Sequence, residues 1–178
     1  MLPHIKGQDG HRRDKDVRGF TLVELLITLT LLALLLSAGV HWQKEALPRH
    51  RVVSASNQVL GLIHYARAEA LTRGPIYLCD GNSHCDRFQT TSSLLLARDR
   101  DGIAAVTDDD VFHRLDLPEG TTLTWRRFRG TALRYERRGN LYYQNGSFVI
   151  CNQGQGRRIV MSVMGTARIE PISGGDCL

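Results

Sequence analysis

The chain has 178 residues, of which 42% are hydrophobic and 23% are charged, and its formal net charge is +5. This length accommodates one modest globular domain together with one membrane segment, and it excludes two enzyme-sized domains. No internal repeat or low-complexity tract divides the chain further.

The first predicted element is an apolar helix over residues 20–40, in which Glu24 is the only strongly polar side chain. At about 1.5 Å of rise per residue, this stretch is long enough to cross the ~30 Å hydrocarbon core of a bilayer. Residues 1–19 precede it and carry more lysine and arginine than aspartate, which marks a cytoplasmic flank. We therefore predict a membrane-spanning helix, with the following residues outside the cytoplasm.

A removable secretory signal is the alternative interpretation of the same segment. Ser37, Ala38 and Gly39 are small residues that could form its cleavage site, but such a signal has a shorter apolar core. At the other end, Gly19 stands directly between the basic leader and Phe20. That position favours processing before the apolar helix rather than after it.

The stretch "RGFTLVELLITLTLL" closely resembles the class III signal of type IV pilins and type II secretion pseudopilins. The resemblance implies that prepilin peptidase cuts between Gly19 and Phe20, that Phe20 is then N-methylated, and that the helix stays attached. It also implies a single-pass protein of the bacterial inner membrane, with its C-terminal domain in the periplasm and a place in a pilus or pseudopilus.

Glu24 becomes the fifth residue of the mature chain under this interpretation. A carboxylate within the bilayer is costly, as is an unpaired α-amino group on Phe20, so the two charges are expected to neutralise each other. In the resembling family the pairing is thought to join neighbouring subunits, and a buried charge pair specifies register because every wrong register leaves charges unpaired. The alternative is a glutamate that merely snorkels to the headgroups.

Residues 41–74 are predicted to continue the helix in amphipathic form. An apolar stripe recurs at three- and four-residue spacing, and its members are Val52, Ser56, Val59, Leu60, Ile63, Ala66 and Ala70. Pro48 predicts a kink or a locally melted turn, and Gly74 followed by Pro75 predicts the end of the helix. The segment "HYARAEALTRGPIYLC" resembles the GspH/FimT group of minor pilins and pseudopilins, independently of the leader.

Residues 75–178 are predicted to form a β-rich domain. Short β-prone runs stand at 76–79, 93–97, 111–117, 121–128, 132–137, 141–143, 147–151, 157–163 and 167–172. Gly139-Asn140 and Asn145-Gly146 are candidate hairpin turns. The expected fold class is α+β and type IV pilin-like, with the long helix packed on one or two antiparallel sheets.

Four cysteines in a domain outside the cytoplasm indicate disulfides. Three connectivities are open; proximity favours Cys79 with Cys85, which leaves Cys151 with Cys177. A zinc site built from Cys79, His84 and Cys85 is the alternative, although a fourth ligand and the usual two-residue spacing are missing.

Other motifs do not indicate catalysis. The aspartates of "DRDG" at 99–102 and of 108–110 resemble a calcium loop, but the twelve-residue ligand pattern is absent and a solvated turn explains them. The sequence contains no nucleophile elbow, zinc-protease helix or phosphate loop. We therefore expect neither enzymatic activity nor a cofactor or metal.

The distal part of the chain is basic, since residues 121–178 carry nine arginines against three acids. Arginine pairs bidentately with phosphate, so Arg157, Arg158 and Arg168 are candidate DNA contacts. Nearby aromatic residues could stack on bases, namely Trp125, Phe128, Tyr135, Tyr142 and Tyr143. FimT-like members bind DNA through a glycine-arginine-any-arginine motif, of which "GTAR" at 165–168 keeps Arg168 but not the first arginine.

Three functions remain open at this point. The first is a minor pilin that helps to initiate or cap a type IV pilus, and the second is an H-type minor pseudopilin of type II secretion. The third is a pilus-associated DNA-binding subunit for natural transformation. The expected partners are prepilin peptidase, other minor and major pilins or pseudopilins, inner-membrane lipid and, for the third function, DNA.

Overall fold

The computed structural model describes residues 20–82, 85–98, 106–172 and 174–177, with side chains for all of these except 38–45, 108, 174 and 176. The chain divides into two compact units, Met1–His41 and Trp42–Leu178. The secondary structure is one long helix, α1 (Leu22–Arg73), followed by eight strands and two short 3-10 turns within the described residues. Both 3-10 turns lie in the second unit, η1 at Asp108–Asp110 and η2 at Gly174–Cys177.

The helix α1 begins after Thr21, whose side chain accepts a hydrogen bond from the Glu24 backbone N–H at 3.2 Å. Thr21 is thus the N-cap, and Glu24 stands at the third helical position, which gives the Thr-x-x-Glu sequence pattern of a capping box. Among the described residues, no helix meets the length and apolarity expected of a membrane-crossing helix. Helical structure continues through Pro48, so the locally melted turn expected there does not form.

The helix ends where the sequence predicts. Gly74 takes a φ of 110°, which a residue with a Cβ rarely adopts, and its N–H donates to the Ala70 carbonyl at 3.3 Å. Pro75 follows and cannot continue the helical hydrogen bonding. The chain then enters β1 (Ile76–Asp80) directly.

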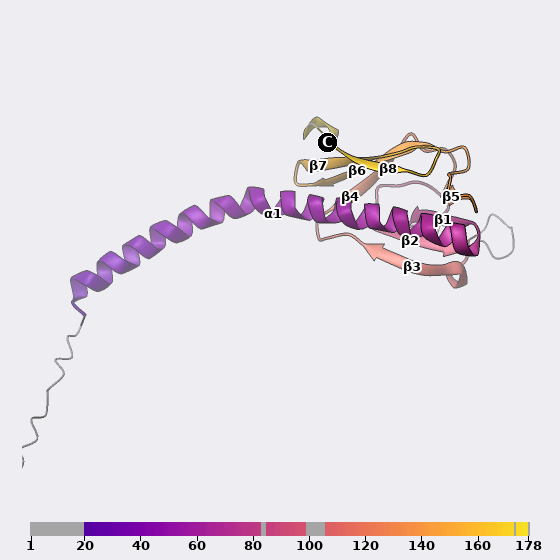
Figure 1. Cartoon of the computed structure of the whole chain (residues 1–178). Helices are drawn as coiled ribbons and strands as arrows, with labels where there is room; N and C mark the ends of the chain where they lie inside the picture. Colours follow the sequence, from indigo (N-terminus) through magenta and orange to yellow (C-terminus); the bar gives the residue numbers. More distant parts are fainter. Residues whose placement is uncertain (1–19, 83–84, 99–105, 173, 178) are drawn as a thin grey trace, which may run out of the picture. The chain divides into compact units, whose positions relative to one another are not determined.

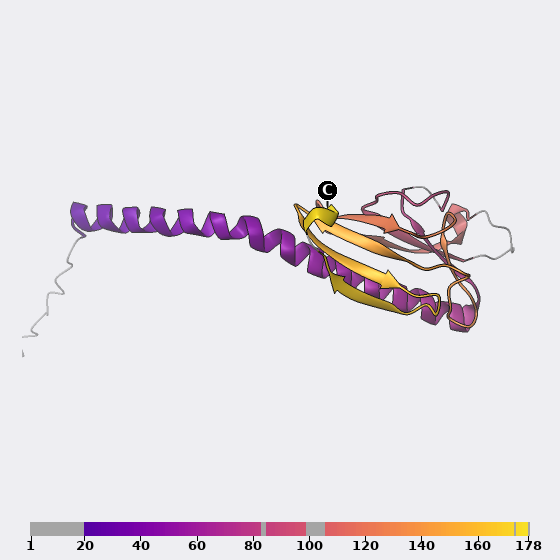
Figure 2. The ribbon, with the colours of Figure 1, turned by 90° about the horizontal axis from the view of Figure 1, so that it is seen from above.

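The strands form two antiparallel four-stranded sheets. Figure 1 shows them on either side of the part of α1 that belongs to the second unit, from Trp42 to Arg73. Sheet A has the order β3-β2-β1-β5, with β2 at Ser93–Arg98, β3 at Val111–Asp116 and β5 at Leu133–Tyr135. Sheet B has the order β4-β6-β7-β8, with β4 at Thr122–Arg126, β6 at Gly146–Asn152, β7 at Gln155–Met161 and β8 at Ala167–Pro171. A bridge between Thr91 and Leu123 joins the two sheets, and Figure 2 shows them from above.

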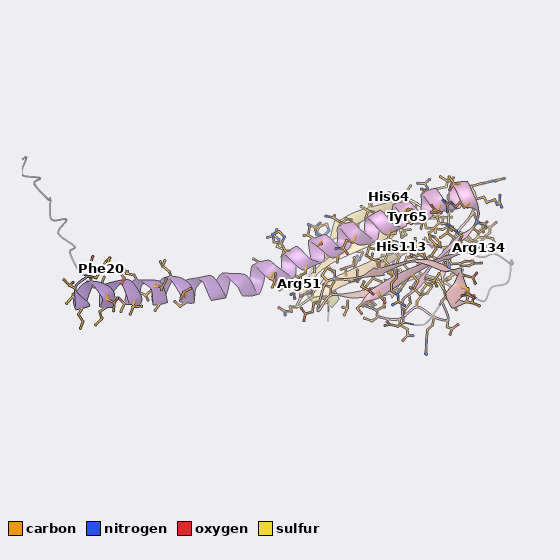
Figure 3. The ribbon with its side chains drawn as sticks, turned by 90° about the horizontal axis from the view of Figure 1, so that it is seen from below. Phe20, Arg51, His64, Tyr65, His113 and Arg134 are labelled. Carbon is orange, nitrogen blue, oxygen red and sulfur yellow. A yellow bond between two sulfur atoms is a disulfide. The ribbon has the colours of Figure 1, made fainter. Side chains whose placement is uncertain are left out.

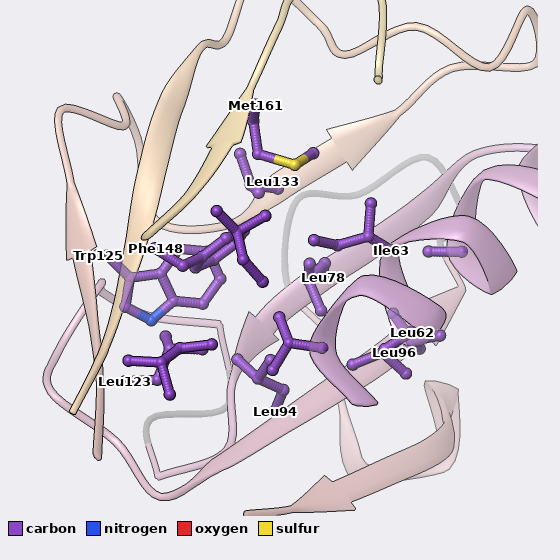
Figure 4. Close-up of a cluster of buried hydrophobic side chains, with 14 of the residues drawn as sticks. Leu62, Ile63, Leu78, Leu94, Leu96, Leu123, Trp125, Leu133, Phe148 and Met161 are labelled. Carbon is purple, nitrogen blue, oxygen red and sulfur yellow. The ribbon is translucent and has the colours of Figure 1, made fainter. Parts of the chain in front are cut away.

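One hydrophobic core unites α1 with both sheets. The predicted stripe of α1 is buried at Val52, Ser56, Val59, Ile63, Ala66 and Ala70, while Leu60 is half-buried. Figure 4 shows Leu62 and Ile63 of α1 facing leucines of sheet A and Phe148 and Met161 of sheet B. At the edge of this core, Tyr65 of α1 contacts His113 of β3, with ring centroids 5.6 Å apart (Figure 3). The prediction of a helix packed on antiparallel sheets is confirmed.

Two details of the strand prediction are wrong. Residues 141–143 form no strand, because only Leu141 bridges to Tyr135. Asn145-Gly146 is not a hairpin turn, since β5 before it lies in sheet A and β6 after it lies in sheet B. The tight hairpin of this region is Gln153-Gly154, whose φ values of 46° and 79° suit a type I′ turn between β6 and β7.

Candidate functional site

The first candidate site is the start of α1. Gly19 lies outside the described residues, and Phe20 is 81% exposed. Glu24 is also exposed, in the first turn of the helix, where the helix dipole favours its carboxylate. Glu24 therefore lies in the first turn of the helix, four residues after Phe20 in the sequence.

The large apolar side chains at the start of α1 are largely exposed. The large ones from Leu22 to Leu36 are each more than half exposed, namely Leu22, Val23, Leu25, Leu26, Ile27, Leu29, Leu31, Leu32, Leu34, Leu35 and Leu36. Contiguous exposed apolar surface of this extent is unfavourable in water and is typical of surfaces that contact lipid or another protein.

The second candidate site is the outward face of sheet B. Strand register places Arg126, Ser147, Val160 and Arg168 in one row across the sheet, and Val149 and Arg158 in the next row. These residues line a groove of about 870 Å³, which also includes Arg127 directly after β4. Arg127 has a φ of 64°, an uncommon conformation for a residue with a side chain. Four arginines thus surround one shallow groove.

The groove also contains an acid among its described lining residues. Glu170 of β8 pairs with Arg168, with its Oε1 2.7 Å from the Arg168 Nε. The register also places Glu170 opposite Arg158 on β7. The groove is therefore basic but partly neutralised at its β8 edge.

The structure separates the predicted arginine set. Arg158 and Arg168 lie on the outward face, whereas Arg157 lies on the side of β7 that carries the buried Ile159 and Met161, because side chains alternate along a strand. The sequence prediction missed Arg126 and Arg127. The outward position of Arg126 could have been predicted from the alternation of β4, in which Leu123 and Trp125 are buried and the intervening residues are not.

Of the five predicted stacking residues, Trp125 and Tyr135 are buried and Phe128 is half-buried. Trp125 and Phe128 pack with Phe148 and Phe88, and Trp125 and Phe88 stack with ring centroids 4.5 Å apart. Tyr135 is fully buried and donates a hydrogen bond to the Gly165 carbonyl at 3.3 Å. Burial raises the pKa of Tyr135 well above its ordinary value, and the Arg67 guanidinium opposes this effect more weakly. Tyr142 and Tyr143 remain exposed, outside the groove.

The cysteines form two disulfides, Cys79 with Cys85 and Cys151 with Cys177. These are the pairs that proximity favoured. The zinc alternative is wrong, because both of its cysteines are oxidised and a disulfide sulfur is no zinc ligand. The second disulfide holds η2 against sheet B, where Gly156 leaves room for the Cys177 sulfur and Gly175 lines the groove.

Only part of the aspartate-rich segment that resembles a calcium loop lies within the described residues. Residues 99–105 lie outside the described part of the chain, while Asp110 accepts hydrogen bonds from the Thr107 backbone N–H and hydroxyl. Within the described residues, no group of three potential metal ligands comes together.

Comparison with known families gives two matches. The family described as type II transport protein GspH matches residues 55–165, and the prokaryotic N-terminal methylation motif matches residues 14–40. No curated protein sequence matches the chain.

Comparison with solved structures identifies the same fold in two kinds of protein. A crystal structure of the type IV minor pilin FimU of Pseudomonas aeruginosa PAO1 aligns with a TM-score of 0.53 and 21% identity, covering 66% of this chain and 91% of FimU. A second crystal form of FimU gives 0.52 and 24%, covering 69% and 90%. The minor pseudopilin EpsH of the Vibrio cholerae type 2 secretion system gives 0.51 and 12%, covering 68% and 97%.

Proposed function

Because the chain belongs to the GspH family of type II transport proteins, we propose that it is a minor pilin that takes part in assembling a type IV pilus, in the initiation or tip complex. The observation that most strongly supports this proposal is that one chain joins a methylation motif at residues 14–40 to a GspH domain at 55–165. The exposed apolar start of α1 supports insertion in the inner membrane and later packing against other subunits. The globular domain then lies in the periplasm.

The proposed assembly chemistry uses three residues. Prepilin peptidase cuts between Gly19 and Phe20, and the new α-amino group on Phe20 is methylated. A neighbouring subunit's Glu24 then neutralises this amine in an apolar environment, where an unpaired charge is strongly disfavoured. The N-cap bond from the Glu24 N–H to the Thr21 hydroxyl supports this role because it orders the first turn of the helix that carries Glu24.

An H-type minor pseudopilin of type II secretion is the second candidate, and the description of the matching family favours it. The two functions use the same processing and the same membrane helix, so they are separated by the machine that needs the protein. Deletion of the gene in the source bacterium should abolish piliation and twitching for a minor pilin, and secretion of exoproteins for a pseudopilin. Complementation with the wild-type chain should restore the lost phenotype.

The location of the protein provides the direct test of the proposal. An epitope-tagged wild-type chain should fractionate with the inner membrane and, in small amounts, with sheared filaments. A chain found entirely as a soluble periplasmic protein, cut after the apolar segment, would show that residues 20–40 are a removable signal and would contradict both filament functions.

DNA binding at the sheet B groove is a further candidate function, favoured by one observation. Arg126, Arg127, Arg158 and Arg168 surround a single groove on an exposed sheet face. Guanidinium groups in this arrangement suit phosphate oxygens, and the absence of aromatic residues from the described lining favours contacts to a backbone over base stacking. Salt-dependent binding tests this function, as described in the Discussion.

A further inference from the structure

A second exposed surface lies at the end of the globular domain where α1 terminates. Its apolar part, here called the distal patch, consists of Tyr142, Tyr143, Val163 and Met164, which are 54%, 82%, 43% and 71% exposed. Tyr142, Tyr143 and Val163 share a hollow of about 510 Å³ with Pro75, which directly follows the helix end. Figure 3 labels Arg134, whose guanidinium lies 5.5 Å from the Tyr142 ring, at this end of the domain.

The backbone beneath the distal patch is held firmly. The Leu141 N–H donates to the Val163 carbonyl at 2.9 Å, and the Tyr142 N–H donates to the Arg134 carbonyl at 3.0 Å. The buried Gln144 side chain accepts from the Arg134 N–H at 3.0 Å and donates to the Ala132 carbonyl at 2.9 Å. The two tyrosines are therefore presented by a fixed loop, which reduces the entropy lost when a partner binds.

Tyr143 is held in an unfavourable conformation. Its φ is 52°, a region that bulky residues rarely adopt, and yet its ring gains almost no burial from it. Strained backbone conformations that gain no packing within the domain are concentrated at functional sites. Rigid, exposed tyrosines are also typical anchors of protein interfaces.

Two arginines border the hollow and supply its charge. Arg137 and Arg138 are exposed and form no ion pair with any residue that the structure describes. The acid of the same hollow, Glu136, is already engaged by Arg134, with its Oε1 3.3 Å from the Arg134 Nε. The surface thus combines an apolar centre with two available cations, which is complementary to a protein surface that carries carboxylates beside apolar side chains.

The same features fit a single-stranded nucleic acid less well. The Tyr142 and Tyr143 rings meet edge to face, at 5.0 Å and 75°, and Arg134 lies over the Tyr142 ring. Val163 and Met164 offer no flat face to a base. A stacking platform for successive bases requires open ring faces, so the distal patch favours a protein partner.

We propose that the distal patch docks the globular domain of a neighbouring pilin-type subunit, on a surface where Asp or Glu side chains stand beside apolar ones. The proposal rests on the assembly function above and adds the partner surface of the domain. Tyr143 is the central anchor, and Arg137 and Arg138 select the acidic partner.

Photo-crosslinking of the full-length chain in its own bacterium tests the docking surface. With p-benzoylphenylalanine in place of Tyr143, we expect a crosslink to a subunit that itself carries a class III signal, mapped by mass spectrometry to a segment containing Asp or Glu. The matched control places the same group at Thr122, an exposed position on sheet B. Equal crosslinking from both positions, or a Tyr143 crosslink only to lipid or to proteins outside the pilin class, would overturn the proposal.

Charge variants test the selection of an acidic partner. R137E together with R138E should lower the yield of the Tyr143 crosslink about tenfold, because favourable pairs become repulsive. R137K together with R138K should retain most of the yield, since the charge is kept. Equal yields in the glutamate and lysine variants would exclude the charge selection. Thermal melting of each variant confirms that the exposed substitutions leave the fold intact.

Two further results distinguish the possible failures. Wild-type protein in sheared filaments without a Tyr143 crosslink overturns the docking surface alone, whereas wild-type protein absent from every filament and assembly fraction overturns the proposed function as well. Fluorescence anisotropy of labelled oligo(dT) with the full chain in detergent covers the nucleic-acid alternative. Binding that Y143A weakens would assign the distal patch to nucleic acid instead.

Discussion

Arg168 and Glu170 pair along the outward face of β8, with the Arg168 Nε 2.7 Å from the Glu170 Oε1. The acid therefore competes with any phosphate for this arginine. If the groove binds DNA, E170Q should raise the affinity about threefold to tenfold at low salt, because one repulsive charge is removed and Arg168 is released. E136Q is the matched control, since Glu136 engages Arg134 outside the groove. Equal gains from both variants would show only a general charge effect.

Processing at Gly19 is the second prediction. G19V should retain the leader, because a branched side chain at the cleavage position obstructs the peptidase. Mass spectrometry of the wild-type protein should find an N-methylated Phe20 at its start, while the variant should keep residues 1–19. Normal cleavage of G19V would contradict the class III interpretation of this segment.

Glu24 has two roles that substitution can separate. E24V should insert in the membrane at least as well as the wild type, since a costly charge is removed, and yet it should fail to enter filaments. T21A keeps the charge and removes the hydroxyl that accepts from the Glu24 N–H, so its effect reports the helix cap alone. If E24V protein is inserted, cleaved and fully functional, the pairing with Phe20 is wrong.

Local periodicity explains why much of the fold was predictable. The stripe from Val52 to Ala70 follows the helical period, and Gly74 with Pro75 ends the helix by backbone geometry that depends only on those residues. The division of the strands into two sheets could not be predicted in this way. Gln144 directly precedes the Asn145-Gly146 pair, and its side chain fixes the loop by bonds to the Arg134 N–H and the Ala132 carbonyl. Such side-chain bonds leave no recognisable pattern in the sequence.

The candidate DNA site shows a different limit of sequence reasoning. Arg157, Arg158 and Arg168 were predicted together as phosphate contacts, but Arg157 and Arg158 are adjacent on one strand and therefore face opposite sides of its sheet. Arg126 joins the groove only through the order of strands in sheet B, which brings β4 next to β6. Strand order depends on long-range packing. No local sequence pattern therefore shows that Arg126 of β4, Arg158 of β7 and Arg168 of β8 share one face of the sheet.

The buried phenol of Tyr135 makes stability depend on pH in the alkaline range. Burial raises its pKa in the folded state above the value near 10 of an unfolded tyrosine, so the folded state holds the proton more tightly. The stabilisation is complete below pH ~10 and is lost as the pH rises through the folded-state pKa. Y135F should cost about 1 kcal/mol near neutral pH through the lost hydrogen bond to Gly165, and should reduce the alkaline loss. Denaturant midpoints between pH 7 and pH 11 measure both effects, and an unchanged alkaline slope in Y135F would assign that slope to other groups.

The outward position of Arg158 and the opposite position of Arg157 provide a test of DNA binding in two adjacent residues. If phosphates occupy the sheet B groove, log K for duplex DNA should fall linearly with log salt, at a slope near −0.9 per phosphate neutralised. Substitution of Arg126, Arg158 and Arg168 by alanine should flatten that slope by about 2 to 3 and abolish transformation while piliation persists. R157A should leave the slope unchanged, whereas R158A alone should flatten it by about 1, because only the latter side chain reaches the groove. If the wild-type chain in detergent fails to bind DNA at low salt, where electrostatic binding is strongest, or if R157A and R158A change the slope equally, the groove is not a phosphate site and its arginines serve solvation or contacts between subunits.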